Sequence, residues 1–278
     1  MHHLLSRRSF LGVIPSLTGV GLVMGAGRVL AKAGATPSAA PPVAAPPLSD
    51  TFPRMELSVV QAFVGVSHGN LAEVRRMVER QPALARASWD WGYGDWETGL
   101  GAAAHTGGRE IAELVLAHGA HPTLFSAAML GQLDVVKAMV TASPGIQKTP
   151  GPHGLPLLHH AKVGGKDAAP VVAYLESVGG ADTRAASAPL EAAERDALVG
   201  RYVFGAGERD LLEVNVQKDQ LGIERPGMTR RMLTHTGGLV FFPSGVPSVR
   251  IAFAKTGARS WQLTVADPEV YLTARRES

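Results

Sequence analysis

The chain has 278 residues, enough for two ordinary domains, and its 45% hydrophobic and 18% charged residues are typical of globular rather than disordered proteins. The formal net charge is +3, but four basic residues before Gly34 account for the whole excess, so we expect neither nucleic acid nor an anionic membrane as a partner. Cysteine is absent, which excludes disulfides and cysteine-ligated zinc.

The N-terminal residues carry the pattern of an export signal. Arg7 and Arg8 precede a weakly apolar stretch that is too short to span a membrane. This arrangement resembles a twin-arginine signal, and the small residues on either side of Lys32 predict cleavage after Ala33. The resemblance implies a signal peptide at 1–33, export of a folded chain to the periplasm, and no stable membrane insertion after cleavage. An uncleaved anchor is the alternative.

Four similar units follow an alanine- and proline-rich linker at 34–52. Each unit has a small or apolar start seven residues before a glycine, and these glycines are Gly69, Gly107, Gly131 and Gly165. Their mean step is about 32 residues, close to the 33-residue ankyrin period. The units therefore predict a repeat architecture.

The second unit resembles an ankyrin repeat along its whole length. It contains the segments Thr98–Leu100 and Ala102–Ala104, then Gly107, spaced aliphatic residues, and Gly119–Thr123. The resemblance implies an ankyrin α-solenoid of about four repeats. Alanine-rich first helices would approach one another closely, second helices would turn aliphatic side chains toward the stack, and the glycines would supply left-handed bends. We assign this domain to residues 53–183.

The segment Gly65–Gly69 matches the Gly-x-Ser-x-Gly pattern of a hydrolase nucleophile, with Ser67 as the nucleophile. A hydrolase of that kind needs several strands upstream of the serine, and the chain between Gly34 and Ser67 has no room for them. We therefore favour an inter-helix turn at this segment and keep a serine hydrolase as an alternative.

Three of the chain's four tryptophans lie between the first and second units. Large aromatic side chains beside acids on a projecting loop are typical of binding hot spots. The other interpretation is that the rings fold back as a lid over the first unit. The candidate binding residues in this segment are Trp89, Trp91, Tyr93, Asp95, Trp96 and Glu97.

Six histidines of the repeat region are potential metal ligands, namely His105, His118, His121, His153, His159 and His160. Two of them, His118 and His121, occupy turn positions, and the ankyrin resemblance implies that His159 hydrogen-bonds the backbone. We therefore predict structural roles for the histidines, no metal and no cofactor, and keep His105 and His160 as candidates for a ligand-facing surface.

The C-terminal part changes from helical to alternating periodicity after a linker at 184–196. Several runs alternate apolar and polar residues, Leu212–Gln217 among them, and turn residues separate them at hairpin spacing. This pattern predicts a small antiparallel β-sheet or barrel for residues 197–278. Its opening residues Leu198–Tyr202 and the later run Gly238–Pro243 resemble the β module appended to some β-lactamase-like serine hydrolases.

The expected fold class is thus α+β and multidomain. The expected function is non-catalytic binding of another protein or peptide in the periplasm, because solenoids offer extended binding surfaces. Two alternatives stay open. One is a serine hydrolase that uses Ser67, and the other is a carrier of a small apolar ligand in the β domain.

Overall fold

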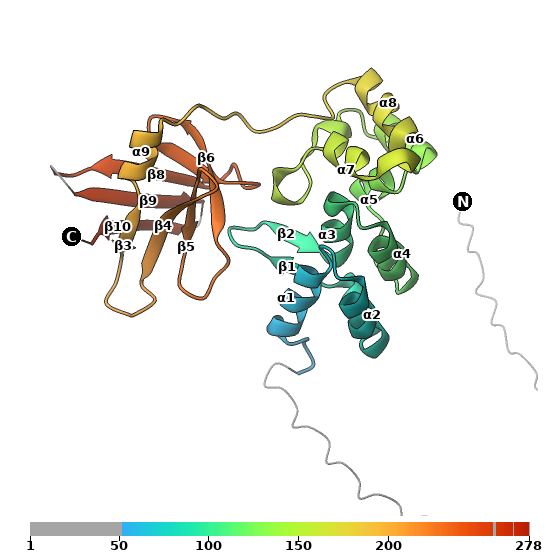
Figure 1. The fold of residues 1–278 in the computed structure, drawn as a ribbon, viewed down its shortest axis with the longest axis horizontal. Coiled ribbons are helices and arrows are strands. Elements are labelled where there is room, and N and C mark those ends of the chain that lie inside the picture. The colour runs from blue at the N-terminus through green and yellow to red at the C-terminus, as the bar shows by residue number, and fades with distance from the viewer. Residues whose placement is uncertain (1–51, 258–259, 269, 278) are drawn as a thin grey trace, which may run out of the picture. The chain divides into compact units, whose positions relative to one another are not determined.

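The computed structural model describes residues 52–257, 260–268 and 270–277. The predicted signal peptide with Arg7, Arg8 and Ala33, and the linker up to residue 51, lie outside these residues. The described residues form one compact unit. It contains a helical part followed by a β-barrel (Figure 1).

The helical part consists of four consecutive helix pairs. These are α1 (Leu57–Val66) with α2 (Leu71–Arg80), α3 (Gly99–Thr106) with α4 (Arg109–Ala117), α5 (Leu124–Met129) with α6 (Leu133–Ala142), and α7 (Leu157–Val163) with α8 (Ala169–Val178). Short 3-10 helices lie between them, namely η1 (Pro82–Arg86), η2 (Ile146–Lys148), η3 (Pro152–Gly154) and η4 (Gly165–Ala168). A hairpin of β1 (Ser88–Asp90) and β2 (Trp96–Thr98) projects between the first two pairs.

Small residues let these helices pack closely. The side chains of Ala102, Ala103 and Ala104 on α3 are all fully buried. Gly99 at the start of α3 is closer still to α1, because a Cβ atom there would lie 2.6 Å from Cε1 of Phe63. The aliphatic side chains of the second helices complete the core, as Val74 and Val115 show by their complete burial.

The predicted ankyrin solenoid is wrong. The paired helices span only six to ten residues, and the four unit glycines do not occupy equivalent bends. Gly107, Gly131 and Gly165 adopt left-handed conformations with φ of 79°, 77° and 69°, but Gly165 begins a 3-10 helix, and Gly69 has no positive φ.

Side chains end α1 where the repeat pattern predicts a glycine. The Ser67 hydroxyl donates to the Phe63 carbonyl at 2.7 Å, and Nδ1 of His68 hydrogen-bonds the carbonyls of Val64 and Gly65 at 3.1 Å. These bonds satisfy carbonyls that a left-handed glycine would otherwise help to satisfy. The first bend therefore differs from those at the ends of α3 and α5.

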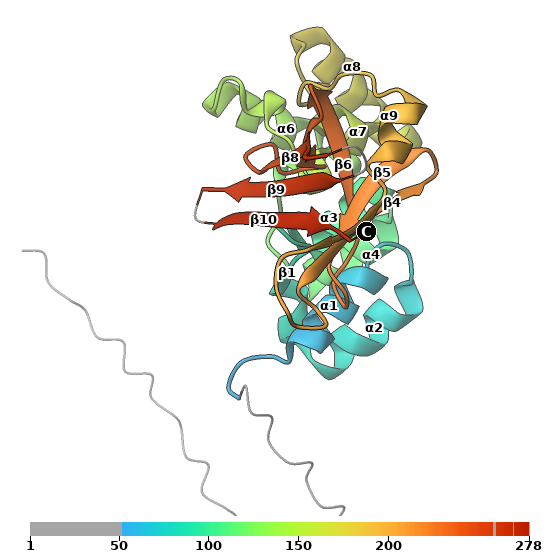
Figure 2. The same cartoon turned by 90° about the vertical axis from the view of Figure 1, so that its left-hand side faces the viewer.

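The C-terminal part is a closed eight-stranded antiparallel barrel, so the open-sheet alternative is wrong. A short helix, α9 (Ala192–Ala197), precedes it. The strands are β3 (Gly200–Val203), β4 (Leu211–Gln217), β5 (Gln220–Glu224), β6 (Arg231–Gly237), β7 (Val240–Pro243), β8 (Arg250–Lys255), β9 (Trp261–Asp267) and β10 (Val270–Arg276). Figure 2 shows β9 beside β10, and β10 also pairs with β3, which closes the barrel.

Side chains fill the barrel interior. Tyr202, Phe241, Ile251 and Leu263 are all at most 1% exposed, and the Phe253 ring packs edge-on against Tyr202 and Phe241. An eight-stranded barrel is just wide enough for such a filling. The interior thus provides a packed core rather than a space for an apolar ligand.

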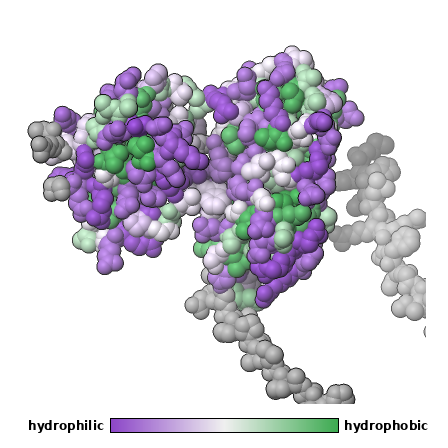
Figure 3. Space-filling view, in the orientation of Figure 1, coloured by the Kyte–Doolittle hydropathy of each residue, from purple (hydrophilic) through white to green (hydrophobic). Residues whose placement is uncertain are grey.

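The face shown in Figure 3 is mostly hydrophilic, with smaller hydrophobic patches over both the helices and the barrel. Among the described residues, no helix combines the length and apolar character that crossing a membrane would require.

Candidate metal centre

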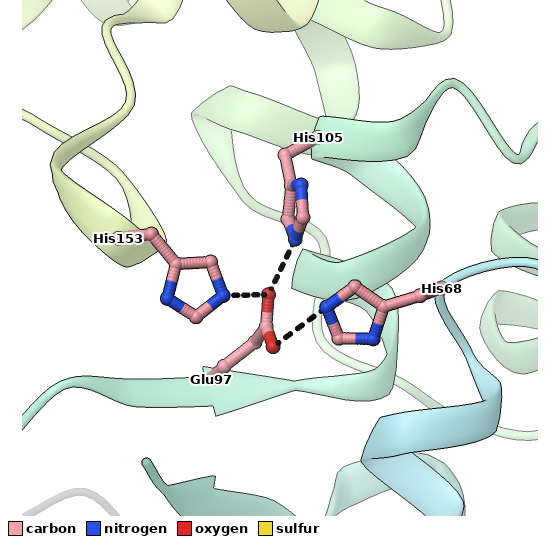
Figure 4. Close-up of side chains that lie close together, drawn as sticks. All are labelled: His68, Glu97, His105 and His153. Atoms are coloured by element: carbon pink, nitrogen blue, oxygen red, sulfur yellow. Dashed lines mark ion pairs between the residues drawn. The ribbon is translucent and has the colours of Figure 1, made fainter. Parts of the chain in front are cut away.

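Four side chains from four separate segments converge beside the β1–β2 hairpin. They are His68, Glu97, His105 and His153, and one ligand atom from each lies within 4.8 Å of all the others. Figure 4 shows the three imidazoles directed toward the Glu97 carboxylate from different sides. Imidazole nitrogens and a carboxylate oxygen are common ligands of zinc and related ions.

Local structure places each of these side chains. His68 follows the last turn of α1, and His105 lies in the last turn of α3, where a helix C-terminus favours a basic group. The side chain of Thr98 caps α3 by accepting the Gly101 amide at 3.0 Å, which fixes the start of that helix. His153 lies in η3 with a φ of 58°, a left-handed conformation that turns its side chain out of the short helix.

The alternation of a strand orients the acids of the hairpin. Asp95 and Glu97 are two residues apart and are 5% and 1% exposed, whereas the intervening Trp96 is 61% exposed. The turn is held by Asp90, whose Oδ1 accepts the amides of Gly92 and Gly94 at 2.8 and 3.1 Å. The hairpin therefore presents two carboxylates to the protein and one indole to solvent.

Glu97 is the centre of the cluster. Its Oε1 lies 2.9 Å from Nε2 of His105 and 3.4 Å from Nε2 of His153, and its Oε2 lies 3.4 Å from Nε2 of His68. Burial alone would raise the pKa of Glu97, but the neighbouring His105 and His153 lower it to about 2. The carboxylate is therefore ionised throughout the physiological range.

Outer contacts leave the Nε2 atoms facing the cluster. Nδ1 of His68 is occupied by the carbonyls at the end of α1, and Nδ1 of His153 hydrogen-bonds Oδ2 of Asp95 at 2.7 Å. The Trp91 indole donates to Oε2 of Glu97 at 2.7 Å. Metal-binding histidines and carboxylates are typically oriented by such second contacts, which also fix the tautomer of the imidazole.

Two polar atoms at the centre have no hydrogen-bond partner. Oε1 of Glu97 and Nε2 of His105 are both buried, and their ion-pair approach lacks hydrogen-bond alignment. A buried polar atom without a partner costs about 1–3 kcal/mol, so it requires an explanation. A metal ion bound to both atoms provides one, because tetrahedral zinc with bonds near 2.0 Å separates its ligands by about 3.3 Å.

The structure divides the predicted binding residues into three groups. Asp95, Glu97 and His105 belong to the cluster or contact it directly. Trp96 is exposed on the outer face of the hairpin. The remaining aromatic side chains, Trp89, Trp91 and Tyr93, line a cavity next to the hairpin.

His160 lies outside the four-residue cluster. It is fully buried, its Nδ1 hydrogen-bonds the Pro156 carbonyl at 3.0 Å, and its ring is 6.5 Å from that of His105. Burial lowers the pKa of His160 to about 4, so this side chain is neutral near pH 7. His159 hydrogen-bonds the His105 carbonyl at 3.0 Å and so helps to hold the helix that carries a ligand.

Sequence reasoning left His68 out of the potential ligands and assigned His153 a structural role. No two of the four cluster residues are separated by the three or four positions that place side chains on one helix face. The signal in the sequence is only that histidines are frequent near turns. We predicted no metal because histidines of the repeat region occupy turn positions. In the fold, however, His68 and His153 lie beside His105 at the end of α3 and Glu97 on β2.

Ser67 has the environment of a structural residue. Its side chain is fully buried and its hydroxyl donates to the Phe63 carbonyl within α1. A nucleophile needs an accessible hydroxyl next to a general base, and the neighbouring His68 instead directs Nδ1 to backbone carbonyls. The geometry therefore gives no support to hydrolysis at Ser67.

Comparisons of this chain with models of known protein families, with curated proteins and with solved structures found no match.

Proposed function

We propose that this protein binds one divalent transition-metal ion, zinc before others, through His68, Glu97, His105 and His153. The observation that carries the proposal is the pair of buried, unpartnered atoms at the point where the four side chains converge, Oε1 of Glu97 and Nε2 of His105. Oxygen-only ions such as Mg²⁺ and Ca²⁺ are disfavoured, because three of the four donors are imidazole nitrogens.

Four protein donors fill the tetrahedral coordination of zinc. Catalytic zinc sites normally keep one position open for water or substrate, whereas closed sites hold structure. We therefore assign the ion a binding and stabilising role without catalysis. It would join the end of α1, strand β2, the end of α3 and η3.

A network without metal accounts for only part of the geometry. Burial would lower the pKa of His153, but Asp95 and Glu97 raise it to about 9, so a protonated His153 bridges the two acids in the metal-free protein. That bridge leaves Nε2 of His105 facing Oε1 of Glu97 at 2.9 Å without an aligned hydrogen bond. A metal ion would bind Nε2 of His105. It would also replace the proton on Nε2 of His153, while Nδ1 of His153 keeps its hydrogen bond to Asp95.

Binding of a protein or peptide partner stays a proposal beside this one. The observation that favours it is Trp96, which is 61% exposed on the hairpin that carries Glu97. Export to the periplasm depends on Arg7, Arg8 and Ala33, outside the described residues, and also stays a prediction.

Calorimetric titration of chelator-treated protein with zinc chloride tests the metal site. We expect one zinc per chain, with affinity lowered at least about tenfold in His105→Ala, because one of four ligands is lost. The matched control is His118→Ala, since His118 also lies at the end of a helix, where its Nδ1 hydrogen-bonds the Leu114 carbonyl at 2.9 Å. No zinc uptake, or equal affinity in both variants and the parent protein, contradicts the proposal.

A further inference from the structure

A cavity of about 460 Å³ lies beside the hairpin. Of the residues that line it, Trp91 also contacts Glu97 of the metal site. The hairpin wall of the cavity carries the rings of Trp89, Trp91 and Tyr93, and its opposite wall is formed by residues of the barrel, including Ile223 and Met228. A volume of this size with mostly apolar walls is typical of small-molecule sites. Planar rings on one wall favour a flat aromatic ligand.

The wall of this cavity also contains Arg231, a charged side chain that uses only part of its hydrogen-bonding capacity. Arg231 on β6 is 8% exposed, and its Nη2 donates to Oδ2 of Asp95 at 2.5 Å and to the Ser244 carbonyl at 2.7 Å. Its Nε is buried and has no hydrogen-bond partner among the described residues. An arginine with unused N–H groups in an apolar wall is suited to donate to a carboxylate oxygen.

The other charged groups of the cavity wall are already engaged. Arg225 donates to the Arg209 carbonyl at 2.7 Å and to Asp210 at 3.2 Å. Oδ1 of Asp90 accepts two backbone amides of the turn, and Oε1 of Glu224 accepts from Asn215 at 3.1 Å. The N–H groups of Arg231 that Asp95 and Ser244 leave unused therefore set the preferred position of a polar group on the ligand.

We infer that this cavity binds a planar aromatic carboxylate, with its rings against Trp89 and Trp91 and its carboxylate on the guanidinium group of Arg231. The inference goes beyond metal binding and depends on other atoms, since none of the four ligand side chains lines the cavity. Trp91 touches both sites, because it lines the cavity and donates to Glu97.

The probe for this site is 2-naphthoate, and 2-naphthamide serves as its neutral isostere. Titration followed by quenching of tryptophan fluorescence and by calorimetry is done on zinc-loaded and on chelator-treated protein. We expect saturable one-to-one binding of the acid, and binding of the amide that is weaker by about tenfold or more, as expected for loss of a charge-assisted hydrogen bond.

Substitutions at the rim keep the test independent of folding and of the metal. Met228 is 60% exposed and lines the cavity, so Met228→Glu introduces repulsion of the carboxylate, and Met228→Gln is the uncharged control of similar size. We expect Met228→Glu to bind 2-naphthoate at least about threefold more weakly than Met228→Gln, with unchanged zinc affinity in both. Arg231→Lys, which lacks the Nε donor, is expected to lose about tenfold in affinity for the acid.

Three results overturn the inference. They are the absence of saturable 2-naphthoate binding to the parent protein, equal affinity for acid and amide, and equal affinity of Met228→Glu and Met228→Gln for the acid. Failure of zinc binding with retained naphthoate binding would contradict only the metal proposal, and the reverse would contradict only this one.

Discussion

His153 connects the proposed metal site to pH. Asp95 and Glu97 raise its pKa to about 9 in the metal-free protein, whereas the unfolded chain has a value near 6.5. A pKa that is higher in the folded than in the unfolded state stabilises the folded protein. This stabilisation is complete at pH values below the unfolded-state pKa and is lost as the pH rises through the folded-state pKa. We therefore expect the stability of zinc-free protein to fall between about pH 7 and pH 9.

Zinc is expected to reverse this trend, because the ion displaces the Nε2 proton of His153 and competes better as protons become scarce. Thermal unfolding at pH 7, 8 and 9, with and without zinc, measures both slopes, and His153→Gln provides a side chain that does not titrate. A zinc-induced rise in Tm that is the same at all three pH values, or a pH slope in the zinc-free protein that His153→Gln retains, would contradict this account.

Residue types alone identified part of the candidate site. The concentration of aromatics and acids between residues 89 and 97 singled out a segment that the structure forms into a β-hairpin, and its predicted binding role stays a prediction. The composition of this segment did not show that the side chains of Asp95 and Glu97 point away from that of Trp96. Their orientation depends on the strand register, in which Asp90 pairs with Trp96 and Trp89 with Glu97. Convergence of four distant residues is a property of the folded chain.

At the level of elements, the spacing of aliphatic residues located the helix pairs, and alternation located strands such as β4 and β9. The ankyrin interpretation failed because a mean glycine spacing close to the repeat period does not require equal backbone conformation at each glycine. At the end of α1, Ser67 and His68 satisfy the last carbonyls with their own side chains, so Gly69 is not needed in a left-handed turn. Barrel closure depends on the long-range pairing of β10 with β3, which no local pattern reveals.

The contact between α1 and α3 positions His68 and His105, and Gly99 makes this contact possible. A Cβ at residue 99 would lie 2.6 Å from Phe63 and 2.9 Å from Oγ of Ser67. We expect Gly99→Ala to destabilise the fold by about 1–3 kcal/mol through overpacking, and to weaken zinc binding because α3 must move.

Gly69→Ala is the matched control for this substitution. Gly69 has no neighbouring atom within 4 Å of the added Cβ and no positive φ, so we expect a change of less than about 0.5 kcal/mol. Urea unfolding of both variants measures the difference. Equal stability of the two variants would contradict the role given to close packing at Gly99.

At the scale of the whole molecule, the hairpin joins the two kinds of architecture. Asp95 contacts His153 of the helical part and Arg231 of the barrel, and Gly154 of η3 lies against Gly245, where an added Cβ would meet backbone at 3.0 Å. The proposed ion lies on the helical side of this junction and the proposed carboxylate in the cavity next to it. Loading of the ion is therefore expected to stiffen the segment that forms one wall of the cavity.

The most direct test of the account is a crystal structure of the zinc-loaded protein with anomalous data collected on both sides of the zinc absorption edge. The account predicts one strong anomalous peak within about 2.0–2.2 Å of Nε2 of His68, His105 and His153 and of Oε1 of Glu97. A peak elsewhere, or an ordered cluster of these four side chains without a peak in zinc-soaked crystals, would contradict it.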